Sequence, residues 1–172
     1  MGIDPADARA FPGFAQLDDR SIDDLRARMR PVRLRPGETL FHRGEQNASL
    51  YLLFRGDVDI VETDGERAVA TRRARTVIGE LGLLLDVPRT ATVVAATDVL
   101  CWEITQQTFY SAIERSEAWA ARLALAIASE LAGRFVDVSA ELTRFDANGG
   151  GPASKPAELA QLRTRLLAEW AF

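Results

Sequence analysis

Residues Ile78 to Val93 read IGELGLLLDVPRTATV, and this stretch carries the most specific chemistry in the chain. Gly79 and Gly82 let the backbone approach a ligand closely. A short helix starting here would point its free amides at an anion. Arg89 adds a planar donor fork that suits two phosphate oxygens. The stretch therefore predicts a site for a ligand that carries a phosphate.

The other residues of this stretch fit a ligand that also contains a sugar. Glu80 would repel a phosphate, so we interpret its carboxylate as the acceptor of a ribose hydroxyl. Thr90 supplies a hydroxyl donor, and Ala91 is small enough to bring its amide close. A simple ion pair between Glu80 and Arg89 is the alternative, but it leaves Thr90, Ala91 and the glycines unexplained.

The bulk composition argues for an ordinary soluble domain without a nucleic-acid surface. The 172 residues are 47% hydrophobic and 27% charged, with 21 basic residues against 25 acidic ones. A net charge of −4 lacks the basic excess on which binding to DNA or to an anionic membrane usually depends. No stretch has the length of a secretory signal or a membrane helix. These features, with one cysteine, favour a cytoplasmic protein.

The residue inventory argues against an enzyme and against a metal site. There is one histidine, His42, beside a predicted turn, where we expect an exposed loop residue. Metal-dependent enzymes built on similar barrels need several histidine and carboxylate ligands. Cys101 stands in an apolar run with no activating partner, so we interpret it as a core residue. We predict no catalytic residue, no metal ligand and no cofactor.

Between Val32 and Ile104, short apolar runs alternate with turn signals such as Pro36-Gly37 and Arg55-Gly56. The strands expected here include Ser49–Phe54, Asp57–Thr63, Glu66–Thr71, Thr90–Thr97 and Val99–Ile104. Asp64-Gly65 is a good hairpin signal. Many short strands at this spacing predict an antiparallel barrel or jelly roll. We expect the basic run 71–75 to be a solvated strand edge or loop.

Helical patterns flank this region on both sides. Leu17 to Met29 predicts a short helix capped by Asp18 or Asp19, and Thr105 caps another through Arg115. A long helix follows from Ser116 to about Phe145. Its apolar stripe consists of Trp119, Leu123, Ile127, Leu131, Phe135, Val138, Leu142 and Phe145.

These patterns divide the chain into four parts. Residues 1–16 form an irregular lead-in, and 17–146 form one domain that includes the helices after the strands. Residues 147–156 are a Gly/Pro linker. Residues 157–172 form an amphipathic C-terminal helix.

Gly79-Glu80-Leu81, followed by Pro88-Arg89-Thr90-Ala91-Thr92-Val93, resembles the phosphate-binding cassette of cyclic nucleotide-binding domains. Kinase regulatory subunits, gated channels and the bacterial catabolite activator share this cassette. Upstream, PGETLF at 36–41, Gly44-Glu45, LYLL at 50–53 and Gly56-Asp57-Val58 also resemble the family. The resemblance covers about 17–145. It implies a mainly β fold, an antiparallel β-roll of about eight strands, with an N-terminal helix and a long C-terminal helix.

The resemblance also implies roles for individual residues. The family's ribose-binding glutamate corresponds to Glu80 and its phosphate-binding arginine to Arg89. Aligning the long helix places Arg134 and Phe135 near the base. Arg134 either contacts the base or is a solvated surface arginine, whereas we expect Phe135 to serve in core or dimer packing. The predicted nucleotide-binding residues are Gly79, Glu80, Leu81, Gly82, Arg89, Thr90, Ala91 and Arg134.

The expected function is a sensor that moves its C-terminal helices when a cyclic nucleotide binds. Thr90 does not decide the base, and we favour cAMP over cGMP because cAMP is the commoner bacterial ligand. We expect a homodimer through the long helix, unless the C-terminal helix folds back onto the stripe. The segment after the long helix is too short for a winged helix-turn-helix, so we expect an unknown effector protein rather than DNA. The alternative is a protein-interaction scaffold with a vestigial pocket.

Overall fold

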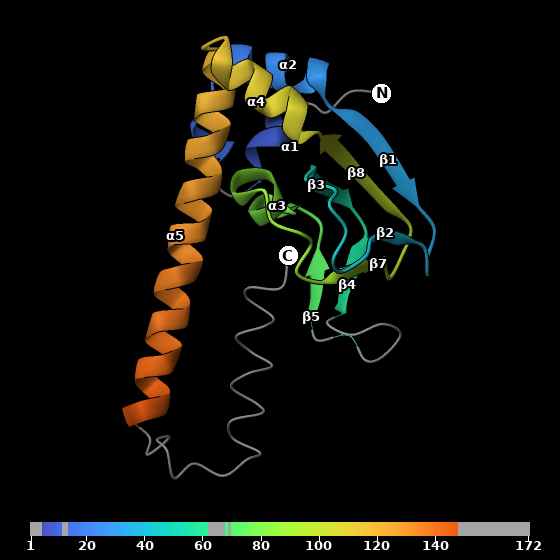
Figure 1. Ribbon diagram of the computed structural model, residues 1–172, viewed down its shortest axis with the longest axis vertical. Helices are drawn as coiled ribbons and strands as arrows, with labels where there is room; N and C mark the ends of the chain where they lie inside the picture. The colour runs from blue at the N-terminus through green and yellow to red at the C-terminus, as the bar shows by residue number, and fades with distance from the viewer. Residues whose placement is uncertain (1–4, 12–13, 62–67, 69, 148–172) are drawn as a thin grey trace.

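Two four-stranded antiparallel sheets form a β-roll that helices cover on one side (Figure 1). The structure is a computed structural model, and it describes residues 5–11, 14–61, 68 and 70–147. The first sheet has the order β1-β8-β3-β6, and the second has the order β2-β7-β4-β5. This confirms the predicted mainly β fold with flanking helices.

The strands of the first sheet are β1 (Arg30–Leu34), β8 (Val99–Ile104), β3 (Leu50–Arg55) and β6 (Thr76–Ile78). Those of the second sheet are β2 (Thr39–Phe41), β7 (Thr92–Ala95), β4 (Asp57–Val61) and β5 (Ala70–Arg73). Four of the expected strands correspond to β3, β4, β7 and β8, whereas the one expected at Glu66–Thr71 overlaps β5 at Ala70 and Thr71 only. The predicted Asp64-Gly65 turn lies outside the described residues. Residues 71–73 of the basic run lie on β5, at an edge of its sheet, as expected, whereas Arg75 follows the strand and pairs with Asp7.

The central strand β3 shows how the two cores are divided. Its first four residues are all buried, because side chains on both faces of the sheet meet apolar neighbours. Leu50 and Leu52 face the helices, whereas Tyr51 and Leu53 point into the roll between the sheets. Cys101 is also completely buried inside the roll. The roll interior and the helix-covered face therefore have separate hydrophobic cores.

The N-terminal segment is more ordered than its composition suggested. The predicted irregular lead-in is wrong for the described residues, which form α1 (Pro5–Arg9) and a 3-10 turn, η1 (Phe14–Gln16). Phe11 and Phe14 are fully buried, and their rings lie 5.9 Å apart. Prolines and a glycine suggested a coil, but burying two phenylalanines against the helical layer outweighs that local preference.

Two helices begin at the capping residues that the sequence indicates. Asp18 caps α2 (Asp19–Arg28) by accepting a hydrogen bond of 2.8 Å from the Ser21 amide. Thr105 caps α4 (Gln106–Glu114) by accepting a hydrogen bond from the Thr108 amide at 3.2 Å. α2 and α4 lie on the outer face of the first sheet, where they bury Trp102 and Ile104.

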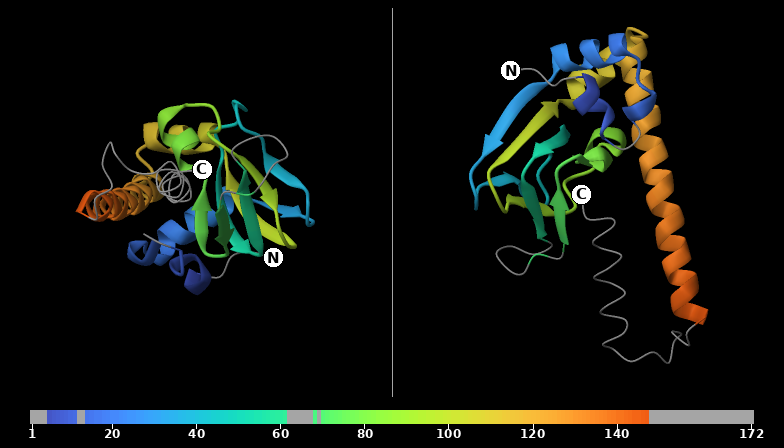
Figure 2. Two further views of the ribbon diagram at one scale, coloured as in Figure 1. Left: turned by 90° about the horizontal axis from the view of Figure 1, so that it is seen from below. Right: turned by 180° about the vertical axis from the view of Figure 1, so that it is seen from behind.

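The long helix α5 (Ala118–Ala147) packs its N-terminal part on the domain (Figure 2). Trp119, Leu123 and Ile127 are buried, and Leu131 is partly buried. Phe135 is 61% exposed, so it is not part of the core, and its expected role in dimer packing stays a prediction. The side chains of Leu142 and Phe145, the predicted linker beyond α5 and the predicted C-terminal helix lie outside the described residues. No described helix is both long and apolar enough to span a membrane.

Candidate functional site

Arg89 lies at the centre of the predicted cassette, and its side chain is buried. Only 3% of the residue is exposed. Its Nη2 donates to the backbone carbonyl of Ser49 at 2.6 Å, and its Nη1 donates to that of Gly79 at 3.2 Å. The arginine therefore connects the start of β3 to the loop before the cassette helix α3 (Glu80–Leu85).

Two glycines provide the space that this guanidinium occupies. Gly79 has a φ of 86°, in the left-handed region that favours glycine. A Cβ atom on Gly79 would collide with Nη1 of Arg89 and lie 2.7 Å from the Ser49 carbonyl oxygen. A Cβ on Gly82 would lie 3.0 Å from the same Nη1. Both predicted glycines thus allow close packing around Arg89.

Aromatic rings line the other side of the guanidinium. The Cζ of Arg89 lies 4.1 Å from the ring centroid of Phe41 and 5.7 Å from that of Tyr51. Such cation–π contacts stabilise a cation that has lost water. Burial nevertheless lowers the pKa of the Arg89 guanidinium. The Nε of Arg89 is buried and has no hydrogen-bond partner among the described residues. A positive charge is therefore held where an anionic ligand would neutralise it.

Glu80 is the second buried charge of the site, and its partner comes from α5. The residue is 2% exposed, and its Oε1 accepts a hydrogen bond of 2.7 Å from Nη1 of Arg134. Arg134 also pairs with Glu130 one turn earlier on α5. Burial raises the pKa of Glu80, and the Arg134 charge opposes that shift. The Oε2 of Glu80 is buried, and no described residue donates a hydrogen bond to it.

These contacts exclude two interpretations that the sequence left open. Glu80 forms no ion pair with Arg89, because its carboxylate binds Arg134 and Arg89 binds two carbonyls. Arg134 is also not a solvated surface arginine, since its side chain is 12% exposed and paired with two carboxylates. Arg134 connects the long helix to the cassette.

The remaining predicted residues lie around these two charges. Thr90 is exposed beside Arg89, and Ala91 is buried in the roll interior. Leu81 is half-buried on α3. A neighbouring turn holds the backbone here: the Gly44 amide donates to the Arg89 carbonyl, and the Arg89 amide donates to the Glu45 carbonyl. The structure thus brings all eight predicted residues into one region.

The sequence did not indicate several residues that contribute to this site. Ser49, Phe41, Tyr51 and Glu130 contact the two central charges or their partners. Alternation along β2 and β3 could have placed Phe41 and Tyr51 inside the roll. The Ser49 carbonyl leaves no signal in the sequence, because any residue could supply it.

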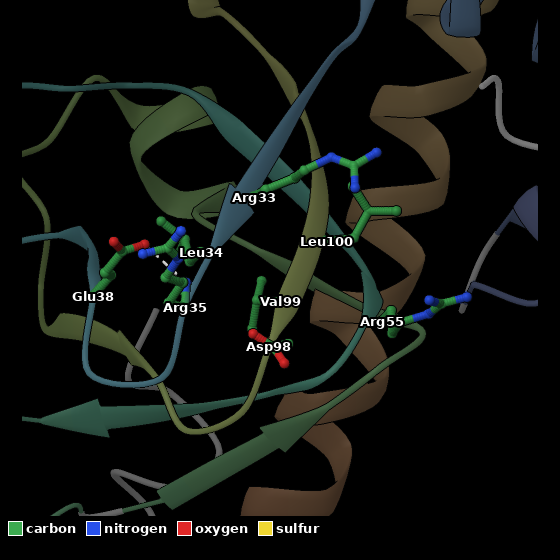
Figure 3. A pocket seen from close by; sticks show the side chains of 8 residues that line it. All are labelled: Arg33, Leu34, Arg35, Glu38, Arg55, Asp98, Val99 and Leu100. Carbon is green, nitrogen blue, oxygen red and sulfur yellow. Dashed lines mark hydrogen bonds between the residues drawn. The ribbon is translucent and has the colours of Figure 1, made fainter.

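A separate surface pocket of about 590 Å³ lies at the opposite end of the first sheet (Figure 3). It is lined by Arg33, Leu34, Arg35, Glu38, Arg55, Asp98, Val99 and Leu100. β3 begins next to Ser49 at the cassette and ends at Arg55 in this pocket, so the two places are a strand length apart. None of the predicted site residues lines this pocket. Its charged side chains are exposed to solvent, unlike those of the cassette.

The described residues also contain no group of three or more histidine, cysteine, aspartate or glutamate side chains that could hold a metal. Burial raises the pKa of the Cys101 thiol to about 12, so this thiol is not an activated nucleophile. The chemistry of the cassette is that of binding: a buried cation, a buried carboxylate with an oxygen available to a donor, and glycines that permit close approach.

A β-roll with this cassette has the architecture of a nucleotide-binding module. The family model for the cyclic nucleotide-binding domain matches residues 31–116, which span β1 to the end of α4. The chain belongs to the cyclic nucleotide-binding domain family.

Individual relatives agree with this assignment. The chain is 34% identical over 99 residues to the acetyltransferase Pat of Mycolicibacterium smegmatis, and 32% identical over 96 residues to the cAMP-dependent protein kinase regulatory subunit of Candida albicans. Each match covers 56% of this chain, but 30% of the first protein and 20% of the second. The chain therefore spans less than a third of either relative.

A solved structure matches over a larger share of both chains. The N-terminal domain of a transcriptional regulator from Streptomyces coelicolor A3(2) superposes with a TM-score of 0.63 at 34% identity. The match covers 74% of this chain and 91% of that one. The described β-roll and helices therefore correspond to nearly the whole of that domain.

Proposed function

We propose that this domain binds cAMP in preference to cGMP and that the ligand controls the position of α5. The observation that carries the proposal is that the two oxygens of the Glu80 carboxylate have different surroundings. Its Oε1 binds Arg134 of α5, while its buried Oε2 has no partner in the described part of the chain. A ribose 2′-hydroxyl donating to Oε2 would satisfy a costly buried acceptor. Glu80 would then contact both the ligand and Arg134, so that ligand binding would affect the docking of α5.

The phosphate would bind at Arg89 without breaking its present contacts. Each terminal guanidinium nitrogen carries a second N–H beyond the one that donates to a carbonyl, and Nε is unpartnered among the described residues. The named cAMP dependence of the Candida albicans relative supports the preference for cAMP. Thr90 remains a proposed ligand contact.

The proposed switch depends on a difference in affinity between two positions of α5. A ligand shifts such an equilibrium only when it binds one state more tightly. With α5 docked, the Arg134 charge favours the ionised form of Glu80, which is the better acceptor for a hydroxyl. We therefore expect the nucleotide to favour the docked helix.

The output would pass through a protein surface. The exposed side of α5 offers an interface for a second copy of the chain, and an effector protein would read the ligand-dependent position of α5. The acidic net charge supports a protein effector rather than DNA. We place the domain in the cytoplasm, which its single cysteine favours, and assign it no enzymatic activity of its own.

Titration calorimetry with cAMP and cGMP tests the proposal. We expect Arg89→Ala and Glu80→Ala each to weaken cAMP binding by about tenfold or more, because each removes a charge-assisted contact of about 1.5–3 kcal/mol. Arg33→Ala is the control, since it removes an exposed arginine at the other end of the sheet. Adenosine, which lacks the phosphate, should bind weakly and be insensitive to Arg89→Ala.

The alternative function is a protein-interaction scaffold with a vestigial pocket. One observation favours it: Arg89 and Glu80 both have hydrogen-bond partners within the chain. The absence of heat and of a thermal shift with either nucleotide at millimolar concentration would reject the sensor and leave the scaffold.

A further inference from the structure

A second buried carboxylate, Glu103 on β8, lies inside the roll close to Arg89. The residue is 7% exposed, and none of the roles proposed above uses it. Its register partner on one side is Arg30 of β1 and on the other Tyr51 of β3. An acidic side chain at such an inward position is costly unless its oxygens are satisfied. Its contacts therefore indicate what it does.

Both oxygens of Glu103 are bound, and one of them connects to the phosphate arginine. The Ser49 hydroxyl donates to Oε1 at 2.6 Å, and Arg30 Nε donates to Oε2 at 2.7 Å. Burial alone would raise the pKa of Glu103, but these hydrogen bonds outweigh it and hold the pKa below its ordinary value. The carbonyl of the same Ser49 accepts the 2.6 Å hydrogen bond from Arg89.

We propose that Glu103 and Ser49 are positioning residues that aim the Arg89 guanidinium at the phosphate, an inference that rests on the proposed function. Ser49 is held at two points: its hydroxyl binds Glu103, and its amide donates to Asn47 Oδ1 at 3.1 Å. Together these contacts restrain Ser49, the residue whose carbonyl binds Nη2 of Arg89. A chain of hydrogen bonds thus runs from Arg30 through Glu103 and Ser49 to Arg89.

The physical reason is the conformational entropy that is lost when a mobile arginine side chain becomes ordered on ligand binding. An arginine that rotates freely must be ordered when the phosphate binds, whereas one already held by carbonyls binds with less loss of entropy. The carbonyl of Gly79 forms the longer of the two bonds, at 3.2 Å. The 2.6 Å bond to Ser49 is therefore the stronger positional restraint on the guanidinium.

Side-chain NMR of the ligand-free protein tests the positioning directly. We expect Ser49→Ala to increase the rate of Arg89 guanidinium rotation about Nε–Cζ several-fold, and Ser49→Thr, which keeps the hydroxyl, to restore it. Glu103→Gln should give a smaller increase in the same direction. Thr71→Val is the matched control, because Thr71 donates to Asp59 at 2.7 Å in the other sheet. An unchanged rotation rate in both Ser49→Ala and Glu103→Gln would overturn the inference.

Calorimetry with cAMP then tests the consequence for binding. Ser49→Ala should weaken binding by about tenfold in the wild-type background. The loss should be much smaller in an Arg89→Lys background, because residues that act through one another are not additive. Equal losses in both backgrounds would contradict a role through Arg89. If the wild-type chain binds neither nucleotide, the proposed function fails, while the rotation measurement still tests the positioning.

Discussion

The backbone of Gly79 lies directly against the Arg89 guanidinium, so a larger side chain at position 79 would displace the arginine. The glycine combines a positive φ with a backbone directly against the Arg89 guanidinium. Gly37 has almost the same φ, 87°, but a Cβ atom added there would meet no described atom within 4 Å. Comparing an alanine substitution at Gly79 with one at Gly37 therefore separates the cost of backbone strain from the cost of disturbed packing at the site.

We expect Gly79→Ala to destabilise the protein more than Gly37→Ala. The left-handed conformation costs each alanine about 1–2 kcal/mol, and only Gly79→Ala also displaces Arg89. Urea unfolding measures the free energies, and calorimetry should show weaker cAMP binding for Gly79→Ala alone. Equal losses of stability and unchanged binding in both variants would contradict this close packing.

Residue by residue, the sequence predicted which residues lie close together better than it predicted how their side chains pair. Gly79, Glu80 and Arg89 lie within one short motif, so a local pattern identifies them. Arg134 is 54 positions away from Glu80 in the chain, and their contact depends on how α5 packs. Its partner could therefore not be read from the sequence.

At the scale of elements, local signals succeeded where the stabilising contacts are local. Asp18 and Thr105 cap their helices through amides three residues ahead, and the sequence shows both. α1 and η1 were missed because their stability comes from Phe11 and Phe14 packing against distant helices. The short strands β2 and β6 depend in the same way on partners far along the chain.

The cap of α2 predicts a pH dependence of stability. Hydrogen bonds from Ser21 and the ion pair with Arg122 of α5 lower the pKa of Asp18 from 3.8 to about 2. Because the folded pKa is depressed, the stabilisation is present above pH 3.8 and is lost as the pH falls towards about 2. Asp18→Asn keeps a capping oxygen but cannot titrate.

We expect the wild type to be more stable than Asp18→Asn near neutral pH, with the difference shrinking as the pH falls below about 4. Urea unfolding of both proteins at a series of pH values measures this difference. If the difference between the two proteins stays constant down to the acid transition, Asp18 does not titrate as its contacts indicate.

At the scale of the whole molecule, α5 packs one face on the domain and leaves another face exposed. The predicted apolar stripe was interpreted as a dimer interface, but its first part, including Trp119 and Leu123, packs on the domain itself. Leu125 and Val136 are 62% and 64% exposed and lie about three helical turns apart on another face. Exposed alanines at 128 and 132 lie between them. A dimer through α5 would use this face.

We expect the wild type to be a dimer in light scattering at micromolar concentration and Leu125→Glu to be a monomer. A glutamate within this face would bury an unpaired charge when the dimer forms. Leu85→Glu is the control, because Leu85 is 63% exposed on α3. A monomeric wild type at every concentration would remove the dimer from the proposed mechanism.

The burial of Cys101 has a consequence for how the protein meets oxidants. It is the chain's one cysteine, it is fully buried between the sheets, and its pKa of about 12 keeps it protonated. Peroxide, glutathione disulfide and alkylating reagents all react with an accessible thiolate. The thiol of the folded domain is therefore insensitive to redox conditions, and it becomes reactive only when the two sheets separate.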